Sequence, residues 1–260
     1  MTLFRSLVFN IVFYVLTALL VLVSLPIFMF GSERAGAWIM YQWGTLGIYL
    51  LRVIAGTKLV VRGLENIPEG GAIFASKHQS MFETFALFPV LERPTYVMKR
   101  ELARIPLWGW YARRGGMVTV ARDQNTTALR KLAVDVQKAV ASNRQVVIFP
   151  EGTRTPPGTS DNYKGGIAHL YRLIGAPVVP MALNSGIFWP RRKFLRYPGN
   201  IVIEFLPPIE PGLTSKVFRK RLIDQIEASA DRLLVEASET VPPPPFPAQA
   251  AARLGELRRG

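Results

Sequence analysis

The sequence has 260 residues, which is enough for one α/β domain with a hydrophobic core and an appended segment. It contains 32 lysines and arginines against 18 aspartates and glutamates, and the resulting net charge of +14 favours anionic partners such as acidic lipids, phosphorylated small molecules or nucleic acid. The sequence contains no cysteine, which excludes disulfides, a thiol nucleophile and thiolate metal sites.

The first segment in chain order is strongly apolar. Residues 7–30 carry no charge, and about 20 apolar residues are enough for a helix to cross a bilayer. A second apolar run, 35–55, has rings that favour the membrane–water boundary: Trp38, Tyr41, Trp43 and Tyr49. We therefore expect residues 1–55 to form a two-helix membrane hairpin, whose second helix spans the bilayer or lies in the interface. The alternatives are a secretory signal, whose apolar region is usually shorter, and two helices buried in a soluble core.

From residue 57 onward, short β-branched runs alternate with helical patterns. We expect strands at 58–62, 72–75, 95–98, 117–121, 145–149, 178–183 and 201–205. Helices are expected at 80–91, 126–141, 166–174 and 215–239. This alternation predicts an α/β domain at 56–240, with a mixed, largely parallel sheet flanked by helices. Residues 241–260 begin with proline-rich sequence, and we expect a loosely ordered Pro/Ala/Arg-rich tail there.

The candidate catalytic residue is His78, just past the predicted strand 72–75, because histidine takes up a proton near neutral pH. Ser80 is a good helix N-cap and Glu83 completes a capping box, so Glu83 has a purely structural interpretation. In the functional interpretation, Glu83 folds back to orient the imidazole. Five positions along one helix would separate the two side chains by about 140°, so the pair requires His78 to precede the helix. The second histidine, His169, has no nearby acid and is expected to be a packed helix residue.

A second motif, Phe-Pro-Glu-Gly-Thr-Arg at 149–154, ends the predicted strand 145–149. Gly152 permits a tight turn and a close backbone approach, and Arg154 offers a forked donor to phosphate. Thr153 adds a hydroxyl, and Glu151 could accept a hydrogen bond from a substrate or hold a neighbouring arginine. The alternative is an ordinary polar turn with a surface ion pair.

The remaining charged residues carry weaker signals. Arg122 follows the predicted strand 117–121 and either binds phosphate or pairs with Asp123. The basic run 191–193 is expected to be solvated or lipid-facing. The sequence has no phosphate loop, dinucleotide fingerprint, nucleophile elbow or zinc-binding helix, so we expect no metal and no bound cofactor.

In their order, these motifs resemble the four blocks of the glycerolipid acyltransferases, specifically the bacterial 1-acyl-sn-glycerol-3-phosphate (lysophosphatidate) acyltransferases. The H-x-x-x-x-D block is matched by His78 and, with a longer acid in place of aspartate, by Glu83. The glycine-led strand ending in arginine is matched by 116–122, F-P-E-G-T-R by 149–154, and the apolar strand with a proline by 178–180. The resemblance covers roughly residues 59–206.

The resemblance implies transfer of a fatty acyl group from acyl-CoA or acyl carrier protein to the sn-2 hydroxyl of lysophosphatidate, which gives phosphatidate. It implies that His78 is the general base, that Glu83 orients and charge-balances it, and that no acyl-enzyme forms. The implied substrate-binding residues are Arg122 and Arg154 for the acceptor phosphate, and Glu151, Gly152 and Thr153 for the glycerol end.

The expected partners are lysophosphatidate, an acyl-CoA or acyl carrier protein, and membrane lipids, with no nucleic acid. The lipid substrates and the positive charge suggest the inner membrane, with the catalytic domain facing the cytoplasm. Three alternatives remain open. They are the same chemistry on another lyso-lipid such as lyso-ornithine lipid, a membrane-bound acyl-thioester hydrolase, and a non-catalytic basic protein that docks on acidic membranes.

Overall fold

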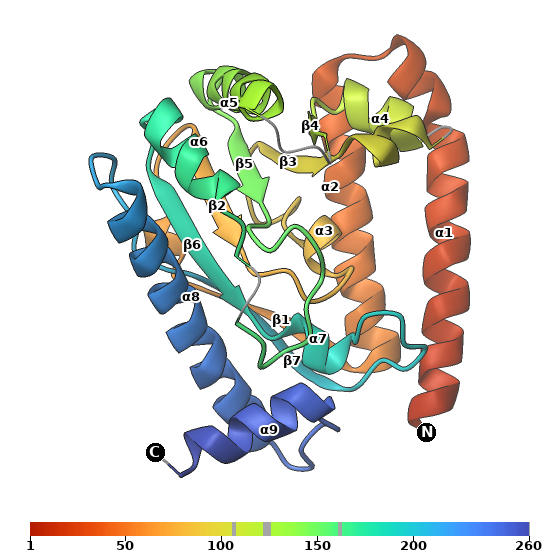
Figure 1. Ribbon diagram of the computed structural model, residues 1–260. Helices are drawn as coiled ribbons and strands as arrows, with labels where there is room; N and C mark the ends of the chain where they lie inside the picture. Colours follow the sequence, from red (N-terminus) through yellow and green to blue (C-terminus); the bar gives the residue numbers. More distant parts are fainter. Residues whose placement is uncertain (106–107, 122–125, 161–162, 260) are drawn as a thin grey trace.

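A mixed sheet forms the centre of the computed structural model, which describes residues 1–105, 108–121, 126–160 and 163–259 (Figure 1). Within these ranges the strand order is β1-β7-β6-β2-β5-β3-β4. The strands are β1 (Thr57–Arg62), β2 (Ala72–Ser76), β3 (Pro94–Lys99), β4 (Val118–Val120), β5 (Gln145–Ile148), β6 (Val178–Leu183) and β7 (Gly199–Phe205). Among these described strands, only β6 and β7 pair antiparallel. The predicted fold class, a largely parallel sheet flanked by helices, is therefore confirmed.

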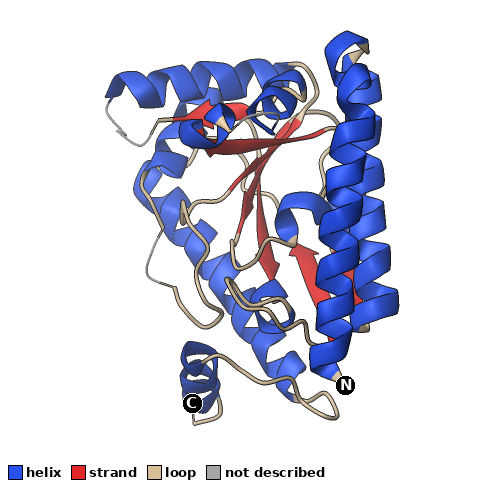
Figure 2. Cartoon of the chain, turned by 90° about the vertical axis from the view of Figure 1, so that its right-hand side faces the viewer, coloured by secondary structure: helices blue, strands red, loops and turns tan. Residues whose placement is uncertain are grey.

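Helices cover both faces of this sheet (Figure 2). One face packs on α5 (Thr126–Ala141), α6 (Gly166–Ile174) and α8 (Ser215–Ser238). The other packs on α1 (Thr2–Phe30), α2 (Glu33–Leu50), α3 (Glu83–Ala86), α4 (Trp108–Arg114) and α7 (Ser185–Phe188). Side chains of β2 alternate between the two cores, with Phe74 in one and Ile73 in the other. Helices thus cover both faces, and in sheets of this kind ligands bind in the crevice near the carboxyl ends of the strands.

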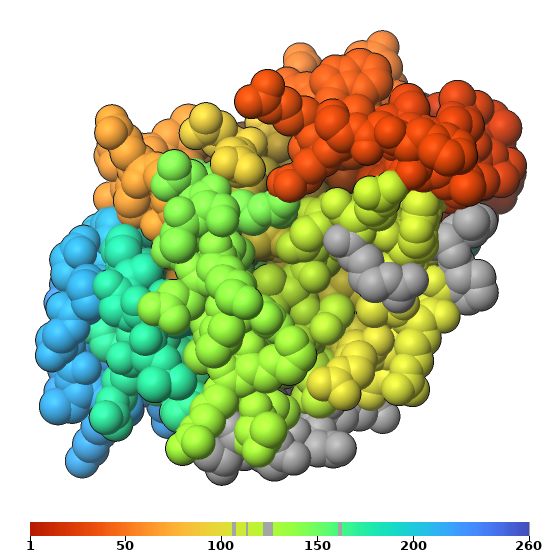
Figure 3. Space-filling view, turned by 90° about the horizontal axis from the view of Figure 1, so that it is seen from above, coloured from red at the N-terminus to blue at the C-terminus, as the bar shows by residue number. Residues whose placement is uncertain are grey.

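Helices α1 and α2 run antiparallel along one side of the domain, and residues 31 and 32 join them. Among the described residues, α1 is the one helix that is long and apolar enough to cross a membrane, with a mean hydropathy of 2.7. Only 17 % of its most apolar window is buried. Its buried residues nevertheless occur near both ends, from Ser6 to Phe28. Seen from above, the red and orange surface of the N-terminal segment lies directly against the yellow and green surface of the domain (Figure 3).

The helix expected over 80–91 is shortened to α3, Glu83–Ala86, with turns after it. Pro89 has no N–H to donate to the carbonyl of Phe85, so the helical ladder stops there. That carbonyl instead faces α2 so closely that a Cβ built on Gly44 would lie 2.6 Å from it. The close approach of α2 therefore goes together with the early end of α3.

The segment after the prolines contains α9 (Ala248–Leu257) where a loosely ordered tail was expected. Ala250 is fully buried, and Arg253 donates to both oxygens of Asp231 on α8, at 3.0 and 2.5 Å. A Cβ added to Gly158 would lie 2.8 Å from the carbonyl of Gln249. The first turn of α9 thus lies against the segment that follows residues 149–154.

Candidate active site

The structure brings together the two residues of the predicted dyad. His78 lies in the loop after β2 and before α3, and its Nδ1 is 2.9 Å from Oε1 of Glu83. With Nδ1–H donating to the carboxylate, Nε2 carries the lone pair, which is the tautomer that a general base needs. The imidazole also stacks on the ring of Phe149, with the centroids 3.9 Å apart. Hydrogen bonding and stacking together fix the orientation of the ring.

The Glu83 carboxylate is fully buried and surrounded by donors. It accepts from the amide N–H groups of Gln79 and Ser80 at 2.6 and 2.7 Å, and from the hydroxyl of Ser185 at 2.8 Å. Burial alone would raise the pKa of Glu83, but the hydrogen bond and charge of His78 and the Ser80 amide outweigh it and lower the pKa below 4.5. The predicted Ser80 N-cap is not found, because α3 begins at Glu83 after the N-cap Phe82; the hydroxyl of Ser80 accepts from the amide of Phe82 at 3.0 Å instead.

Glu151 lies behind His78 and does not line the cavity described below. Its Oε2 accepts from the main-chain N–H of His78 at 2.8 Å, and its Oε1 accepts from the hydroxyl of Thr155 at 2.7 Å. Burial raises the pKa of Glu151, and the nearby charge of Lys77 only partly opposes this shift. The carboxylate therefore supports the loop that carries the histidine, and its predicted contact with the glycerol end of an acceptor stays a prediction.

A buried polar cluster that the sequence analysis missed continues from Glu151. Lys77 is fully buried, its Nζ is 3.4 Å from Glu151, and it donates at 2.6 Å to Oε1 of Glu227 on α8. The hydroxyl of Tyr163 donates to the same oxygen at 2.6 Å. The one available signal was a lysine directly after a fully apolar strand, because a charge in that position needs a buried partner.

A cavity of about 610 Å³ opens beside His78. Its apolar wall comes mainly from the sheet and from α5 and α6: Met117, Val120, Leu129, Leu132, Ile148, Ile167 and Leu170. Five cationic side chains also line it: Lys99, Arg154, Lys164, Arg191 and Arg192. No carboxylate appears among the described lining residues. Such a cavity suits an amphiphile with an anionic head and an apolar chain, placed next to a base.

Three of the predicted substrate-binding residues lie in this cavity wall, namely Gly152, Thr153 and Arg154. Gly152 has a φ of +66°, so the turn uses the conformational freedom of glycine. Burial lowers the pKa of Arg154 from 12.5; the charge of Glu83 partly opposes this shift and that of Arg191 adds to it. Arg122 lies outside the described residues.

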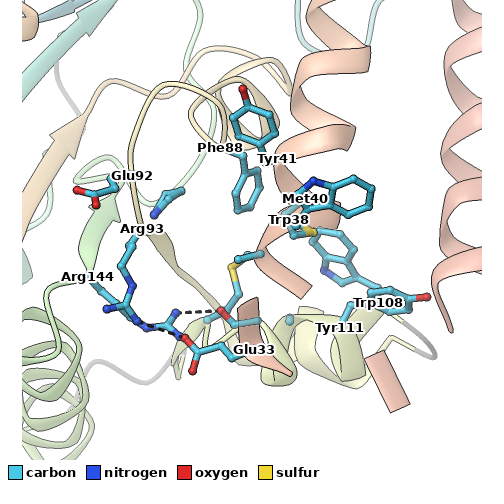
Figure 4. A pocket seen from close by; sticks show the side chains of 15 residues that line it. Glu33, Trp38, Met40, Tyr41, Phe88, Glu92, Arg93, Trp108, Tyr111 and Arg144 are labelled. Atoms are coloured by element: carbon cyan, nitrogen blue, oxygen red, sulfur yellow. Dashed lines mark hydrogen bonds and ion pairs between the residues drawn. The ribbon is translucent and has the colours of Figure 1, made fainter. Parts of the chain in front are cut away.

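A second cavity, of about 370 Å³, lies between α2 and α4 (Figure 4). Glu33 forms an ion pair with Arg144 at its edge and lies 3.7 Å from Arg93. The cavity shares Trp108 and Met117 with the first one, but it contains none of the predicted site residues. We therefore assign the chemistry to the cavity at His78.

Comparisons with known proteins identify the family to which the chain belongs. A family model described as Acyltransferase matches residues 58–184, a range that includes both motifs. The 1-acyl-sn-glycerol-3-phosphate acyltransferase of Pseudomonas aeruginosa is 35 % identical over 79 % of this chain and 79 % of its own length. The beta form from Homo sapiens is 30 % identical over 62 % and 59 %, respectively. The crystal structure of the 1-acyl-sn-glycerophosphate acyltransferase from Thermotoga maritima has the same fold, with a TM-score of 0.75, 23 % identity, and coverage of 90 % of this chain and 98 % of that one.

Proposed function

The chain belongs to the acyltransferase family, and from that premise we propose that it transfers a fatty acyl group from an acyl thioester to the sn-2 hydroxyl of 1-acyl-sn-glycerol-3-phosphate. The observation that carries the proposal is the His78–Glu83 pair beside a cavity with cationic and apolar walls. The cations match the phosphate of such an acceptor, and the apolar wall matches an acyl chain. The names of the similar proteins support the same acceptor.

The dyad supplies the proton transfers of this reaction. Nε2 of His78 takes the proton of the acceptor hydroxyl as its oxygen attacks the thioester carbonyl. The tetrahedral intermediate then collapses, the C–S bond breaks, and the imidazolium returns the proton to the departing thiolate. The products are phosphatidate and a free thiol. The ionised Glu83 stabilises the imidazolium throughout, as the buried acid does in a catalytic triad.

The 149–154 turn has two roles in this proposal. Arg154 binds the acceptor phosphate with its forked donors, and Gly152 and Thr153 border the glycerol end. Glu151 is a positioning residue, because its contacts are with the main chain of His78 and with Lys77. A phosphate contact from Arg122 stays part of the proposal as a prediction from sequence.

Both ends of α1 are held by the same α/β domain. Near its N-terminus the hydroxyl of Ser6 accepts from the amide of Arg196 at 2.8 Å, and near its C-terminus Arg114 donates to the carbonyl of Met29 at 2.5 Å. A helix that crosses a bilayer places its ends on opposite sides of it. We therefore propose that α1 lies in the interface, with its exposed apolar face in one leaflet. The inner membrane, with the domain on the cytoplasmic side, fits this arrangement because water-soluble acyl thioesters reach the site from there.

The decisive experiment measures thiol release by purified protein on vesicles that contain lysophosphatidate, with acyl-CoA or acyl carrier protein as the donor. The His78→Ala variant should lose activity by about 10²–10⁴-fold while it stays folded and vesicle-bound. The matched control is His169→Ala, because His169 on α6 does not line the cavity. Near-normal turnover by His78→Ala would overturn the proposal.

A panel of acceptors separates this function from its rivals. Preference for lyso-ornithine lipid would keep the chemistry and change the acceptor. Release of free fatty acid without any acceptor would indicate a thioester hydrolase. Salt-sensitive vesicle binding without thiol release would indicate a docking protein.

A further inference from the structure

The turn at residues 190–193, between α7 and β7, brings two further arginines to the catalytic cavity. Arg191 and Arg192 both line it, and Arg191 donates to the main-chain carbonyl of Arg154 at 2.6 Å. We propose that Arg191 and Arg192, together with Arg154, bind the acceptor phosphate, so that this turn determines acceptor specificity. The inference rests on the proposed function. It gives a binding role to residues of the basic run 191–193, which the sequence by itself suggested to be solvated or lipid-facing.

The charged side chains of the described residues that line this edge of the cavity are all cations. The carboxylate that opposes the pKa shift of Arg154, that of Glu83, is buried and already bound to His78 and Ser185. The positive charge of Arg191 is among the causes that lower the pKa of Arg154, so the two guanidinium groups repel each other. The described lining residues contribute no carboxylate that would separate them. A phosphate monoester would fill that place, because it carries up to two negative charges and offers oxygens to forked donors.

The backbone of the turn is held in an unfavourable conformation. The amide of Lys193 lies 3.3 Å from the carbonyl of Pro190, which closes a four-residue turn, and Arg192 at its third position has a φ of +57°. That position usually takes glycine or asparagine, because a larger side chain is strained there. Strained residues of this kind persist where the surrounding structure imposes them and occur often at binding sites. An arginine at this position is explained by a use for its guanidinium.

The segment after the turn is fixed to α1. Arg196 is 4 % exposed, lies 4.4 Å from the ring of Trp189, and donates to three successive carbonyls of residues 193–195. Its amide donates to Ser6 on α1 at 2.8 Å, and the side-chain amide of Asn10 donates to the carbonyl of Phe194 at 2.9 Å.

This attachment to α1 indicates which of the two phosphate-bearing substrates, lysophosphatidate or acyl-CoA, the turn binds. The turn stands at the edge of the cavity beside the helix with the apolar outer face. A lipid acceptor arrives from that side, whereas a water-soluble thioester arrives from the aqueous side. We therefore assign the turn to the acceptor.

The test compares Arg191→Ala and Arg192→Gly with Lys193→Ala as the matched control. Lys193 lies in the same turn and is exposed, but it does not line the cavity. The KM for lysophosphatidate should rise about tenfold in each arginine variant, while the KM for acyl-CoA stays within about twofold. Arg191→Lys should recover part of the loss. Arg192→Gly should also raise the Tm by about 2–4 °C, because glycine relieves the strain.

The other possible results of this experiment distinguish a failure of the proposed function from a failure of the inference. If the wild type does not acylate lysophosphatidate, the proposed function fails first. If the wild type acylates it and both arginine variants behave like Lys193→Ala, the inference alone is overturned. A rise only in the KM for acyl-CoA would assign the turn to the donor and would also overturn it.

Discussion

Glu83 and Glu151 are both almost fully buried and both hold His78, but they do so from different sides. Glu83 accepts from the imidazole, whereas Glu151 accepts from the main-chain amide. Donors surround Glu83, and they lower its pKa. Glu151 has Lys77 beside it, but Lys77 is also bound by a second carboxylate, that of Glu227, and the pKa of Glu151 is raised. The comparison shows that equal burial does not fix the direction in which the pKa of a carboxyl group shifts, because burial prevails at Glu151 and the neighbouring donors outweigh it at Glu83.

The largest expected effect comes from breaking the pair on the ring side. Glu83→Gln keeps the size of the side chain but removes the charge that stabilises the imidazolium and selects the tautomer. We expect kcat to fall by about 10³–10⁴-fold with little change in the KM for either substrate. Steady-state kinetics on vesicles measures this, with the Tm as a check on folding. A loss smaller than about tenfold would contradict the dyad.

Breaking the contact of Glu151 with the main chain of His78 should cause a smaller loss of kcat. Glu151→Gln keeps one acceptor oxygen for the His78 amide but removes the charge that faces Lys77. We expect kcat to fall by about 10–100-fold through misplacement of the imidazole, with the KM for lysophosphatidate nearly unchanged. A raised KM with normal kcat would instead show that Glu151 contacts the acceptor.

One step farther from the histidine, the effect should move from activity to stability. Glu227→Gln leaves buried Lys77 with a weaker partner, so we expect the free energy of unfolding to fall by about 1–3 kcal/mol. The loss of kcat should be smaller than in Glu151→Gln. Denaturant unfolding in detergent measures the first quantity. Glu236→Gln, at a half-exposed ion pair on the same helix, is the control and should change stability by at most about 1 kcal/mol.

The smallest expected effect is that the stability contributions of Glu83 and Glu151 change with pH in opposite directions. Because the pKa of Glu83 is lowered, its contribution to stability is present above 4.5 and is lost as pH falls through the folded value. The pKa of Glu151 is raised, so its contribution is present below 4.5 and is lost as pH rises through the folded value. The stability deficit of Glu83→Gln should therefore grow as pH rises toward 4.5, and that of Glu151→Gln should shrink as pH rises above 4.5. Parallel pH profiles of the unfolding free energy would contradict the comparison.

Much of the fold and the dyad could be predicted because their signals are local. The β-branched runs give the strands, and His78 and Glu83 are close in sequence, so one short loop brings them together. The end of α3 had a local signal in Pro89, whereas the close approach of α2 at Gly44 is a tertiary contact and could not be predicted.

The missed parts of the site depend on distant contacts or on backbone geometry. Lys77 and Glu227 are 150 positions apart. Glu227 also lies in a helix rich in charged residues, a pattern that is typical of a helix exposed to solvent. The turn that carries Arg191 includes a positive φ at Arg192, and no glycine or asparagine marks that position in the sequence. The helix α9 was not predicted, because the prolines before it indicate the end of ordered structure, whereas they follow α8 and allow another helix after them.

The contacts of α8 and α9 with the active-site loops also set an order of events during synthesis. Residues 150–160 leave the ribosome well before Glu227 of α8 and the first turn of α9, both of which lie against the active-site loops. The apolar helix α1 is made before either. Because domains form progressively as the chain emerges, the nascent protein can settle on a bilayer while its histidine loop is still unsupported.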